Sequence, residues 1–295
     1  MADRASPSVT GTTRVAGVIG SPVRHSLSPT LLNAAFRATG LDWVYVAFEV
    51  PEGAGAAAVA AMRTLGLRGL SVTMPHKAAA WEAVDERTPT AEALGAVNCV
   101  FERDGRLVGD NTDGPGFVDS LVRDEGVALA GRRCVLLGAG GAGRAVARAL
   151  GEADVAEVVV VNRSPDPARW AAELAGRVGR VGEVGDVAAA DVVVNATSLG
   201  MAGGAGADAT PVDPDLLRAG QVVVDLVYHP AETPLLAAAR ARGAVAVNGV
   251  GMLVHQAAHA FARWTGEPPP LREMTTAIRH ELARRAPSAG SSSRS

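Results

Sequence analysis

Hydrophobic positions along this chain form short apolar runs that alternate with longer stretches rich in alanine. The runs are bounded by glycine, proline and other turn residues, as β-strands usually are. The stretches between them carry apolar side chains at helical spacing. Strands that alternate with helices in this way are typical of βαβ units around a parallel sheet. We therefore predict an α/β fold.

The predicted strands fall into two series. The first series comprises residues 14–20, 44–50, 69–75 and 98–111. Its last segment contains Asp104-Gly105, a dipeptide that favours a hairpin turn inside a β-ribbon. The second series begins at Arg133 and continues through EVVVVNRS, DVVVNATS, QVVVDLVY and AVAVNGV. Its continuous runs of valine and leucine indicate strands that are covered on both faces.

The helical stretch between Asp113 and Gly131 is the natural connector of two domains, 1–113 and 114–248. From Gly249 the pattern is wholly helical, and prolines 268–270 divide it into two helices within 249–285. Residues 286–295 are rich in serine and poor in apolar side chains, so we expect a disordered tail.

Composition narrows the class of ligand. The 295 residues are 48% hydrophobic and 20% charged, which fits a soluble protein of roughly two domains. The formal charge of -3 predicts no basic face for nucleic acid or lipid headgroups, so the expected ligands are small molecules. No signal-like or bilayer-length apolar stretch is found, so we expect a cytoplasmic protein. Cys99 and Cys134 lie in strand-like runs and are interpreted as buried thiols.

One glycine-rich motif follows the first strand of the second series. Residues Gly138, Ala139, Gly140, Gly141, Ala142 and Gly143 fit the G-x-G-x-x-G pattern between a strand and a helix. Glycines there allow a tight turn and let backbone amides reach a pyrophosphate. In this context the motif predicts a dinucleotide site, the alternative being a merely flexible turn.

The next strand ends at Asn162, Arg163 and Ser164, where a dinucleotide-binding domain meets the adenosine ribose. NAD sites usually have an acidic residue at this point, whereas a guanidinium suits a phosphate dianion. The sequence therefore favours NADP. Two alternatives stay open: Arg163 is an ordinary surface arginine, or nearby Asp166 binds ribose hydroxyls.

Polar residues also follow strands of the first series. Ser26 and Ser28 precede a helix, where hydroxyls and helix amides suit a carboxylate, although both serines could merely cap the helix. Lys77 follows the third strand, and Asn98 and Asp113 lie at turns. A lysine, an aspartate and amides could hold a polyhydroxylated ring and supply a proton.

His255 and His259 lie one helical turn apart, as in zinc-binding helices. The catalytic glutamate of such helices is replaced by Gln256, which cannot act as a base, and no third ligand is apparent. We therefore predict no metal. Gln256 is a better candidate for binding a hydroxyl group.

Seven ordered blocks together make the chain resemble the shikimate dehydrogenase family from about Val15 to Ala283. They are GSPVRHSLSP, SVTMPHK, GAVN, DNTDGPGF, GAGGAGRA with NRS, NATSLGM with DLVYHPAETPLL, and NGVGMLVHQAAHAFARWTG. The resemblance implies a substrate domain, a Rossmann-type NADP domain and C-terminal helices that pack back on the first domain. It also implies NADPH-dependent reduction of 3-dehydroshikimate to shikimate. We expect the protein to be a monomer or a homodimer.

The resemblance further implies roles for individual residues. Lys77 and Asp113 would be the catalytic pair. The substrate carboxylate and ring hydroxyls would be bound by Ser26, Ser28, Thr73, Tyr228, Asn98 and Gln256. Outside the glycine-rich loop and the 162–164 segment, the cofactor groove would be formed by Thr197, Ser198, Met201, Leu226 and Gly249.

The chain departs from the family pattern at a few positions. Ser71 stands where the family often has asparagine, and Cys99 where threonine is usual, so a supporting hydrogen bond could differ. Pro167 stands where a second basic residue often binds the cofactor, and Arg169 is its possible substitute. A quinate/shikimate dehydrogenase, an aminoshikimate dehydrogenase and a catalytically silent NADP-binding sensor are the alternative functions. Lys77 and Asp113 together argue against the sensor.

Overall fold

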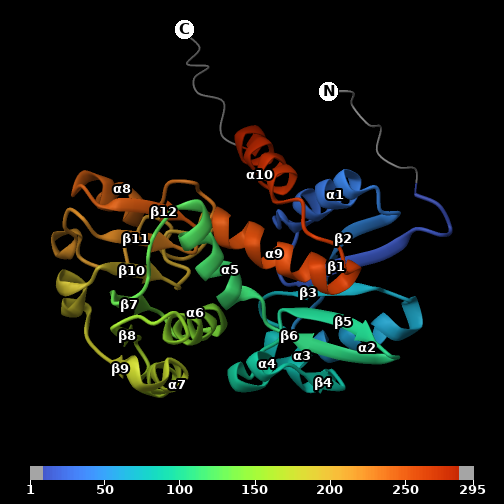
Figure 1. The fold of residues 1–295 in the computed structure, drawn as a ribbon, viewed down its shortest axis with the longest axis horizontal. Helices are drawn as coiled ribbons and strands as arrows, with labels where there is room; N and C mark the ends of the chain where they lie inside the picture. The colour runs from blue at the N-terminus through green and yellow to red at the C-terminus, as the bar shows by residue number, and fades with distance from the viewer. Residues whose placement is uncertain (1–8, 286–295) are drawn as a thin grey trace, which may run out of the picture.

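The computed structural model describes residues 9–285, and the predicted tail at 286–295 lies outside the described residues. Two six-stranded sheets stand side by side, each flanked by helices (Figure 1). The predicted α/β class is therefore confirmed. Within the described residues, no helix is long and apolar enough to cross a membrane.

The first sheet has the strand order β2-β1-β3-β5-β6-β4. Its strands are β1 (Arg14–Gly20), β2 (Trp43–Glu49), β3 (Gly69–Val72), β4 (Glu86–Arg87), β5 (Cys99–Arg103) and β6 (Arg106–Asp110). The helices between them are α1 (Ser28–Thr39), α2 (Gly55–Leu65), α3 (Lys77–Ala83) and α4 (Pro89–Leu94). Strands β5 and β6 pair antiparallel. Asp104 and Gly105 between them both have positive φ, which confirms the predicted hairpin turn.

The second sheet is parallel throughout, in the order β12-β11-β10-β7-β8-β9. Its strands are β7 (Arg133–Leu137), β8 (Glu157–Val161), β9 (Gly179–Val181), β10 (Val192–Asn195), β11 (Val222–Asp225) and β12 (Val245–Asn248). Its helices are α6 (Gly141–Gly151), α7 (Pro165–Leu174), α8 (Pro234–Ala241) and short 3-10 turns η2 (Gly176–Val178), η3 (Val184–Ala189) and η4 (Pro214–Leu216). Strands β7, β8 and β9 extend the sheet in one direction, and β10, β11 and β12 extend it in the other, so the strand order reverses between β7 and β10. Ligands of doubly wound sheets bind at such a reversal.

Three helices connect the sheets. Helix α5 (Asp113–Asp119) runs into the π-helical turn η1 (Ser120–Asp124), and α9 (Val250–Thr265) packs against both. The predicted connector helix is thus shorter than expected, since it ends at Asp124 rather than near Gly131. Gly126 has a φ of 66°, a left-handed conformation that ends the helix.

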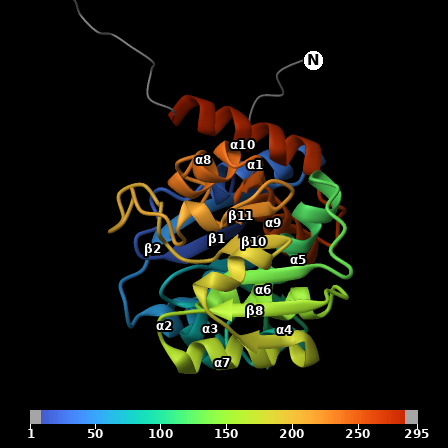
Figure 2. The ribbon, with the colours of Figure 1, turned by 90° about the vertical axis from the view of Figure 1, so that its left-hand side faces the viewer.

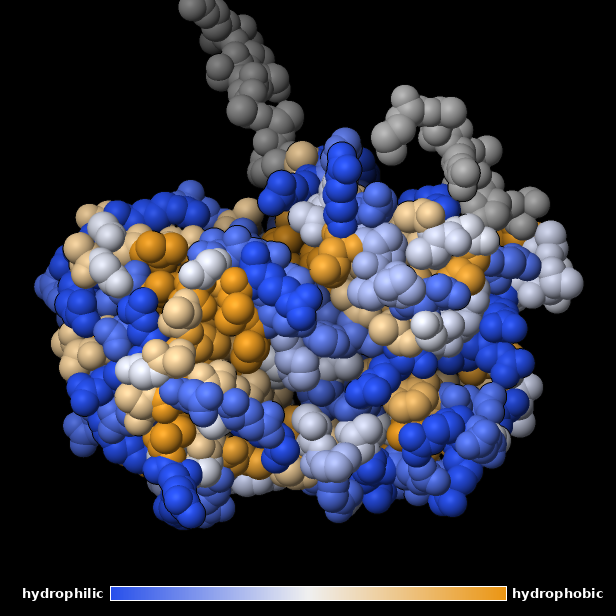
Figure 3. Space-filling view, in the orientation of Figure 1, coloured by the Kyte–Doolittle hydropathy of each residue, from blue (hydrophilic) through white to orange (hydrophobic). Residues whose placement is uncertain are grey.

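Helix α10 (Leu271–Arg285) packs against α1, on the first sheet's side of the molecule (Figures 1 and 2). On the face shown in Figure 3, apolar residues gather mainly over the half that holds the second sheet. The interior of both halves is apolar and includes both thiols, as predicted. Burial raises the pKa of Cys134 to about 12 and that of Cys99 further, so both stay protonated near neutral pH.

Candidate active site

Lys77 and Asp113 form an ion pair where the first sheet ends. Lys77 is the first residue of α3, just beyond β3, and Asp113 is the first residue of α5, just beyond β6. Lys77 Nζ lies 2.5 Å from Asp113 Oδ2, and their side chains are only 19% and 9% exposed. Lys77 is also the only lysine among the chain's 28 lysines and arginines. Sequence reasoning passed over this signal, which sets the chain's one lysine side chain apart from its many permanently charged guanidinium groups.

Asn98 holds the other oxygen of Asp113. Asn98 Oδ1 accepts a hydrogen bond from the Thr112 amide at 2.8 Å, which sets the orientation of the side chain. Asn98 Nδ2 therefore points to Asp113 Oδ1, at 2.7 Å, and to Thr112 Oγ1 at 3.1 Å. The Asp113 amide in turn donates to Asn111 Oδ1 at 3.1 Å. The carboxylate is thus fixed between an ammonium and an amide.

The two serines lie at the start of α1. Ser26 Oγ accepts the Ser28 amide at 3.2 Å, whereas the N-cap residue Leu27 makes no side-chain cap. Thr73 lies just beyond β3, and its amide donates to the Ile19 carbonyl of β1 at 3.0 Å. A side chain at Gly20 would collide with Thr73 Cγ2, so a glycine there lets the Ser26 loop pass close to Thr73.

Tyr228 and Gln256 come from the later part of the chain. Tyr228 packs on the apolar cluster of the first half, and burial raises its pKa. A Cβ at Gly116 would lie 2.6 Å from the Gln256 amide nitrogen, so α9 passes directly over α5. Gln256 Nε2 donates to the Leu253 carbonyl of its own helix at 2.9 Å. The residue is therefore beside the helix of Asp113, but its amide group bonds locally.

The glycine-rich loop joins β7 to α6. Gly138 has a φ of 100°, and a side chain at Gly143 would collide with the Gly138 carbonyl, so both positions require glycine. The start of α6 thus keeps its amides accessible to an anion. A Cβ at Gly141 would lie 3.7 Å from Lys77 Cδ, which places the loop beside the catalytic candidate.

Asn162, Arg163 and Ser164 follow the end of β8, where the sequence predicts the adenosine ribose to bind. Asn162 Oδ1 accepts the Ala139 amide at 3.2 Å, and its Nδ2 donates to the Ser164 carbonyl at 2.9 Å. Arg163 is exposed, and within residues 9–285 it makes no hydrogen bond or ion pair. Arg169, by contrast, is paired with Asp166. Arg163 therefore has the more available guanidinium.

A buried polar network, which the sequence analysis missed, lies at the strand ends beside the other predicted cofactor residues. Asn195, Asp225 and Asn248 end three neighbouring strands in register. Asp225, fully buried, accepts Asn195 Nδ2 at 2.9 Å, Thr233 Oγ1 at 2.6 Å and the Val227 amide at 3.0 Å. The available signal was the polar residue that ends each valine run.

This network brings the predicted groove residues together. Asn195 Oδ1 accepts both the amide and the hydroxyl of Thr197, and the Asn195 carbonyl accepts the Leu226 amide. A side chain at Gly249 would collide with the Leu226 carbonyl. The Met201 amide donates to the Ser198 carbonyl at 3.2 Å, which closes the turn that follows Thr197.

The histidine pair of α9 has acidic partners instead of a metal-ligand set. His255 Nε2 lies 3.1 Å from Asp124, and His259 Nε2 lies 2.8 Å from Asp119. Across residues 9–285, no three His, Cys, Asp or Glu side chains cluster closely enough to hold a metal. The two pairs join α9 to α5 and η1.

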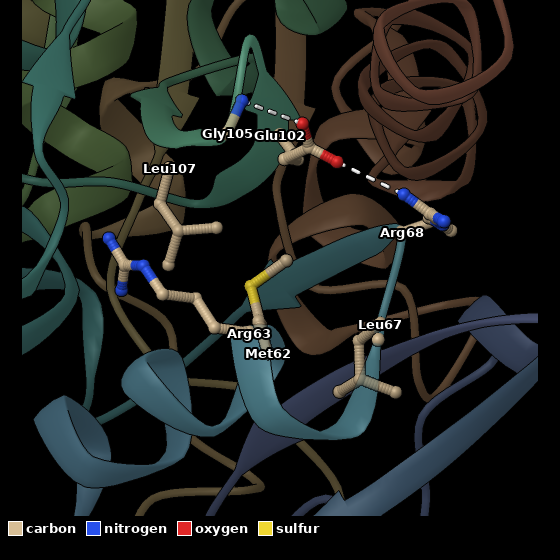
Figure 4. Close-up of a pocket in the computed structure, with 8 residues that line it drawn as sticks. Met62, Arg63, Leu67, Arg68, Glu102, Gly105 and Leu107 are labelled. Atoms are coloured by element: carbon tan, nitrogen blue, oxygen red, sulfur yellow. Dashed lines mark hydrogen bonds and ion pairs between the residues drawn. The ribbon is translucent and has the colours of Figure 1, made fainter.

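A separate small pocket is lined by the end of α2, the segment that follows it and the β5–β6 hairpin (Figure 4), and it contains none of the predicted site residues. Its arginines are both paired, Arg63 with Asp85 and Arg68 with Glu102. The charges that could attract an anion are therefore neutralised locally.

The chain is similar to known proteins over most of its length. Family models match residues 18–100 (shikimate dehydrogenase substrate binding domain), 120–201 (shikimate/quinate 5-dehydrogenase) and 249–279 (shikimate 5'-dehydrogenase C-terminal domain). The NADP(+) shikimate dehydrogenase of Moorella thermoacetica is 45% identical, over 93% of this chain and 95% of its own length. That of Symbiobacterium thermophilum is 47% identical, over 90% of this chain and 94% of its own length. The Thermus thermophilus shikimate dehydrogenase, solved with NADP(H) and shikimate, is 39% identical with a TM-score of 0.84, over 91% of this chain and 99% of that one.

Proposed function

Because the chain belongs to the shikimate dehydrogenase family, we propose that it catalyses the reversible NADPH-dependent reduction of 3-dehydroshikimate to shikimate, in the biosynthesis of aromatic amino acids. The observation that carries the proposal is the Lys77–Asp113 pair beside the glycine-rich loop. A proton donor is thereby adjacent to a site for a hydride donor, as an NADP-dependent oxidoreductase acting on a CH-OH group requires.

The residues of the second half fit a dinucleotide phosphate. The glycine-rich loop of Gly138, Ala139, Gly140, Gly141, Ala142 and Gly143 would receive the pyrophosphate, because its amides lie at a helix start. Asn162, Arg163 and Ser164 would bind the phosphorylated ribose. Thr197, Ser198, Met201, Leu226 and Gly249 would line the nicotinamide side of the groove. NADPH supplies the hydride.

The chain's own residues handle the proton. As the carbonyl carbon accepts a hydride, negative charge grows on the oxygen, and the Lys77–Asp113 pair delivers a proton to it. In the reverse direction the pair takes the hydroxyl proton as the hydride leaves. Asn98 keeps Asp113 in position throughout, because its amide bonds the second carboxylate oxygen.

The substrate would lie between the start of α1, near the two serines, and the start of α5, at Asp113. Ser26, Ser28, Thr73 and Tyr228 would bind the carboxylate, since hydroxyl groups donate to carboxylate oxygens. Asn98, Asp113 and Gln256 would bind ring hydroxyls. For Gln256 this requires its Nε2 to exchange the Leu253 carbonyl for the substrate. We propose that residues 1–113 and 249–285 bind the substrate and that 114–248 bind NADP, in a cytoplasmic monomer or homodimer.

The test is a spectrophotometric assay of shikimate, quinate and aminoshikimate with NADP and with NAD. Efficient turnover of shikimate with NADP alone is the expected result. Faster turnover of quinate or aminoshikimate would reassign the substrate, and no turnover with any pair would favour a catalytically silent NADP-binding protein. Size-exclusion chromatography with light scattering separates monomer from dimer.

A further inference from the structure

The last described residue of α10 reaches the loop that carries the two serines. Arg285 Nη1 donates to the His25 carbonyl at 2.8 Å, and His25 immediately precedes Ser26. Arg285 Nε also lies 2.6 Å from Glu281 Oε1, one turn earlier on the same helix. Helix α10 packs against α1, and the two helices lie next to each other in both ribbon views (Figures 1 and 2). The end of the helical segment is thus tied to the start of the substrate site.

Arg285 also acts on Tyr228, which approaches from the other half of the chain. Burial raises the pKa of Tyr228, and the positive charge of Arg285 partly opposes that rise. The guanidinium therefore lies within electrostatic reach of the phenol while it is bonded beside Ser26. Arg285 therefore binds the loop that carries Ser26 and also exerts its charge on Tyr228.

The local charges leave this cation only partly neutralised. Arg284 and Arg285 share one carboxylate, that of Glu281, so the end of α10 keeps a net positive charge. A guanidinium has five N–H donors. Within residues 9–285, Glu281 and His25 are the only hydrogen-bond partners of the Arg285 side chain. Its side chain is 32% exposed, so its remaining donors can meet a ligand.

The proposed carboxylate site otherwise consists of neutral hydroxyl groups. Hydroxyls can donate hydrogen bonds to a carboxylate, but they do not balance its charge. A guanidinium adds that charge and makes charge-assisted bonds that are about twice as strong as neutral ones. It also draws an anionic substrate toward the site from solution.

We propose that Arg285 is a substrate-binding residue that attracts the substrate carboxylate and holds the Ser26 loop through the His25 carbonyl. This inference rests on the proposed function, since it takes the substrate to be a carboxylate bound at Ser26, Ser28 and Tyr228. It makes the end of α10 part of the active site.

The test compares Arg285→Met with Arg284→Met. Arg284 is a matched control, because it shares Glu281 but, within residues 9–285, donates no hydrogen bond to the Ser26 loop. With shikimate, Arg285→Met should raise KM about tenfold, the lower end for a charged hydrogen bond because the site is partly exposed. The KM should rise far more than kcat falls. The uncharged methyl ester of shikimate should show no such difference, and Arg284→Met should leave both KM values near wild type.

Three results would overturn the inference: equal shifts in the two variants, an equal loss with the methyl ester, or an unchanged KM for shikimate in Arg285→Met. If Arg285→Met unfolds, Arg285→Lys decides the question, because it keeps the charge and should retain much of the affinity for shikimate without changing that for the ester. A wild-type protein that fails to oxidise shikimate would count against the proposed function instead. Calorimetric titration with shikimate would then still compare binding in the two variants.

Discussion

Replacing Lys77 by arginine separates two ways in which this residue could work. A guanidinium keeps the positive charge beside Asp113 but does not release a proton near neutral pH. Lys77 Nζ lies 2.5 Å from Asp113 Oδ2, so an arginine can preserve an ion pair at this place. If Lys77 works by proton transfer, Lys77→Arg is nearly inactive. If it works by charge alone, the variant is active.

The expected loss of activity is that of removing a positioned proton donor. A positioned proton donor contributes about 10²- to 10⁴-fold in rate, which corresponds to about 2.7 to 5.5 kcal/mol of activation free energy. We expect kcat to fall by that factor in Lys77→Arg, with a few-fold change in KM. Lys77→Ala should lose as much activity and also some stability, since Asp113 loses its partner. The pair is largely but not fully buried, so its contribution should lie between those of surface and fully buried ion pairs, at about 1 to 3 kcal/mol.

The assay follows NADPH absorbance at saturating substrate, with thermal unfolding measured in parallel. Near-wild-type kcat in Lys77→Arg would refute proton transfer by Lys77 and leave Asp113 as the donor. Because Lys77 is the sole lysine, an amine-directed acylating reagent can react only there and at the N-terminal amine. Acylation should abolish activity in the wild type, bound shikimate should protect it, and Lys77→Arg should incorporate label at the N-terminus alone.

Four further outcomes are expected. Arg163→Ala should weaken NADP binding about tenfold and barely change NAD binding. An unchanged ratio of the kcat/KM values with the two cofactors would show that Arg163 does not contact the cofactor. Asp225→Asn should raise the KM for NADPH more than Gln221→Met does. Gln221 is the control, because it is equally buried but precedes the opposite end of β11, and equal effects would mean that the Asp225 network contributes only to stability. Hydrogen bonds from Arg284 and Arg285 lower the pKa of Glu281 from 4.5 to about 2, so its stabilisation should be complete above pH 4.5 and disappear as pH falls toward 2. The unfolding temperature of Glu281→Gln should therefore approach that of wild type near pH 2, and a constant gap would contradict this. Chelators should leave the rate unchanged, whereas a loss that zinc restores would reveal a metal site.

Local sequence patterns were sufficient for the fold class. The valine runs that become β10 and β11 are buried on both faces, and that burial is encoded in consecutive residues. The hairpin at Asp104-Gly105 and the tight turn at Gly138 follow from backbone conformations that few other residues adopt. Such features depend on neighbours along the chain, so the sequence alone is enough to predict them.

The identities of the site residues came from motif order, but their partners came only from the tertiary structure. His255 and His259 resemble metal ligands in the sequence, yet they meet aspartates 131 and 140 positions earlier because α9 crosses α5 and η1. Arg285 meets a carbonyl 260 positions earlier because α10 returns to α1. The end of α5 likewise followed from one glycine conformation at Gly126 rather than from the helical pattern before it.

The physical reason is the range of the interactions. Propensity, turn chemistry and apolar periodicity act over a few residues, so one sequence determines them almost independently of the rest of the chain. Hydrogen-bond direction and net charge depend on groups that only folding brings together. Asn98 Nδ2 can donate to Asp113 because the Thr112 amide already donates to Asn98 Oδ1 and fixes the orientation of the side chain. The sequence by itself determined which chemical groups the protein has, and the packing of α5, α9 and α10 decided which of them act together.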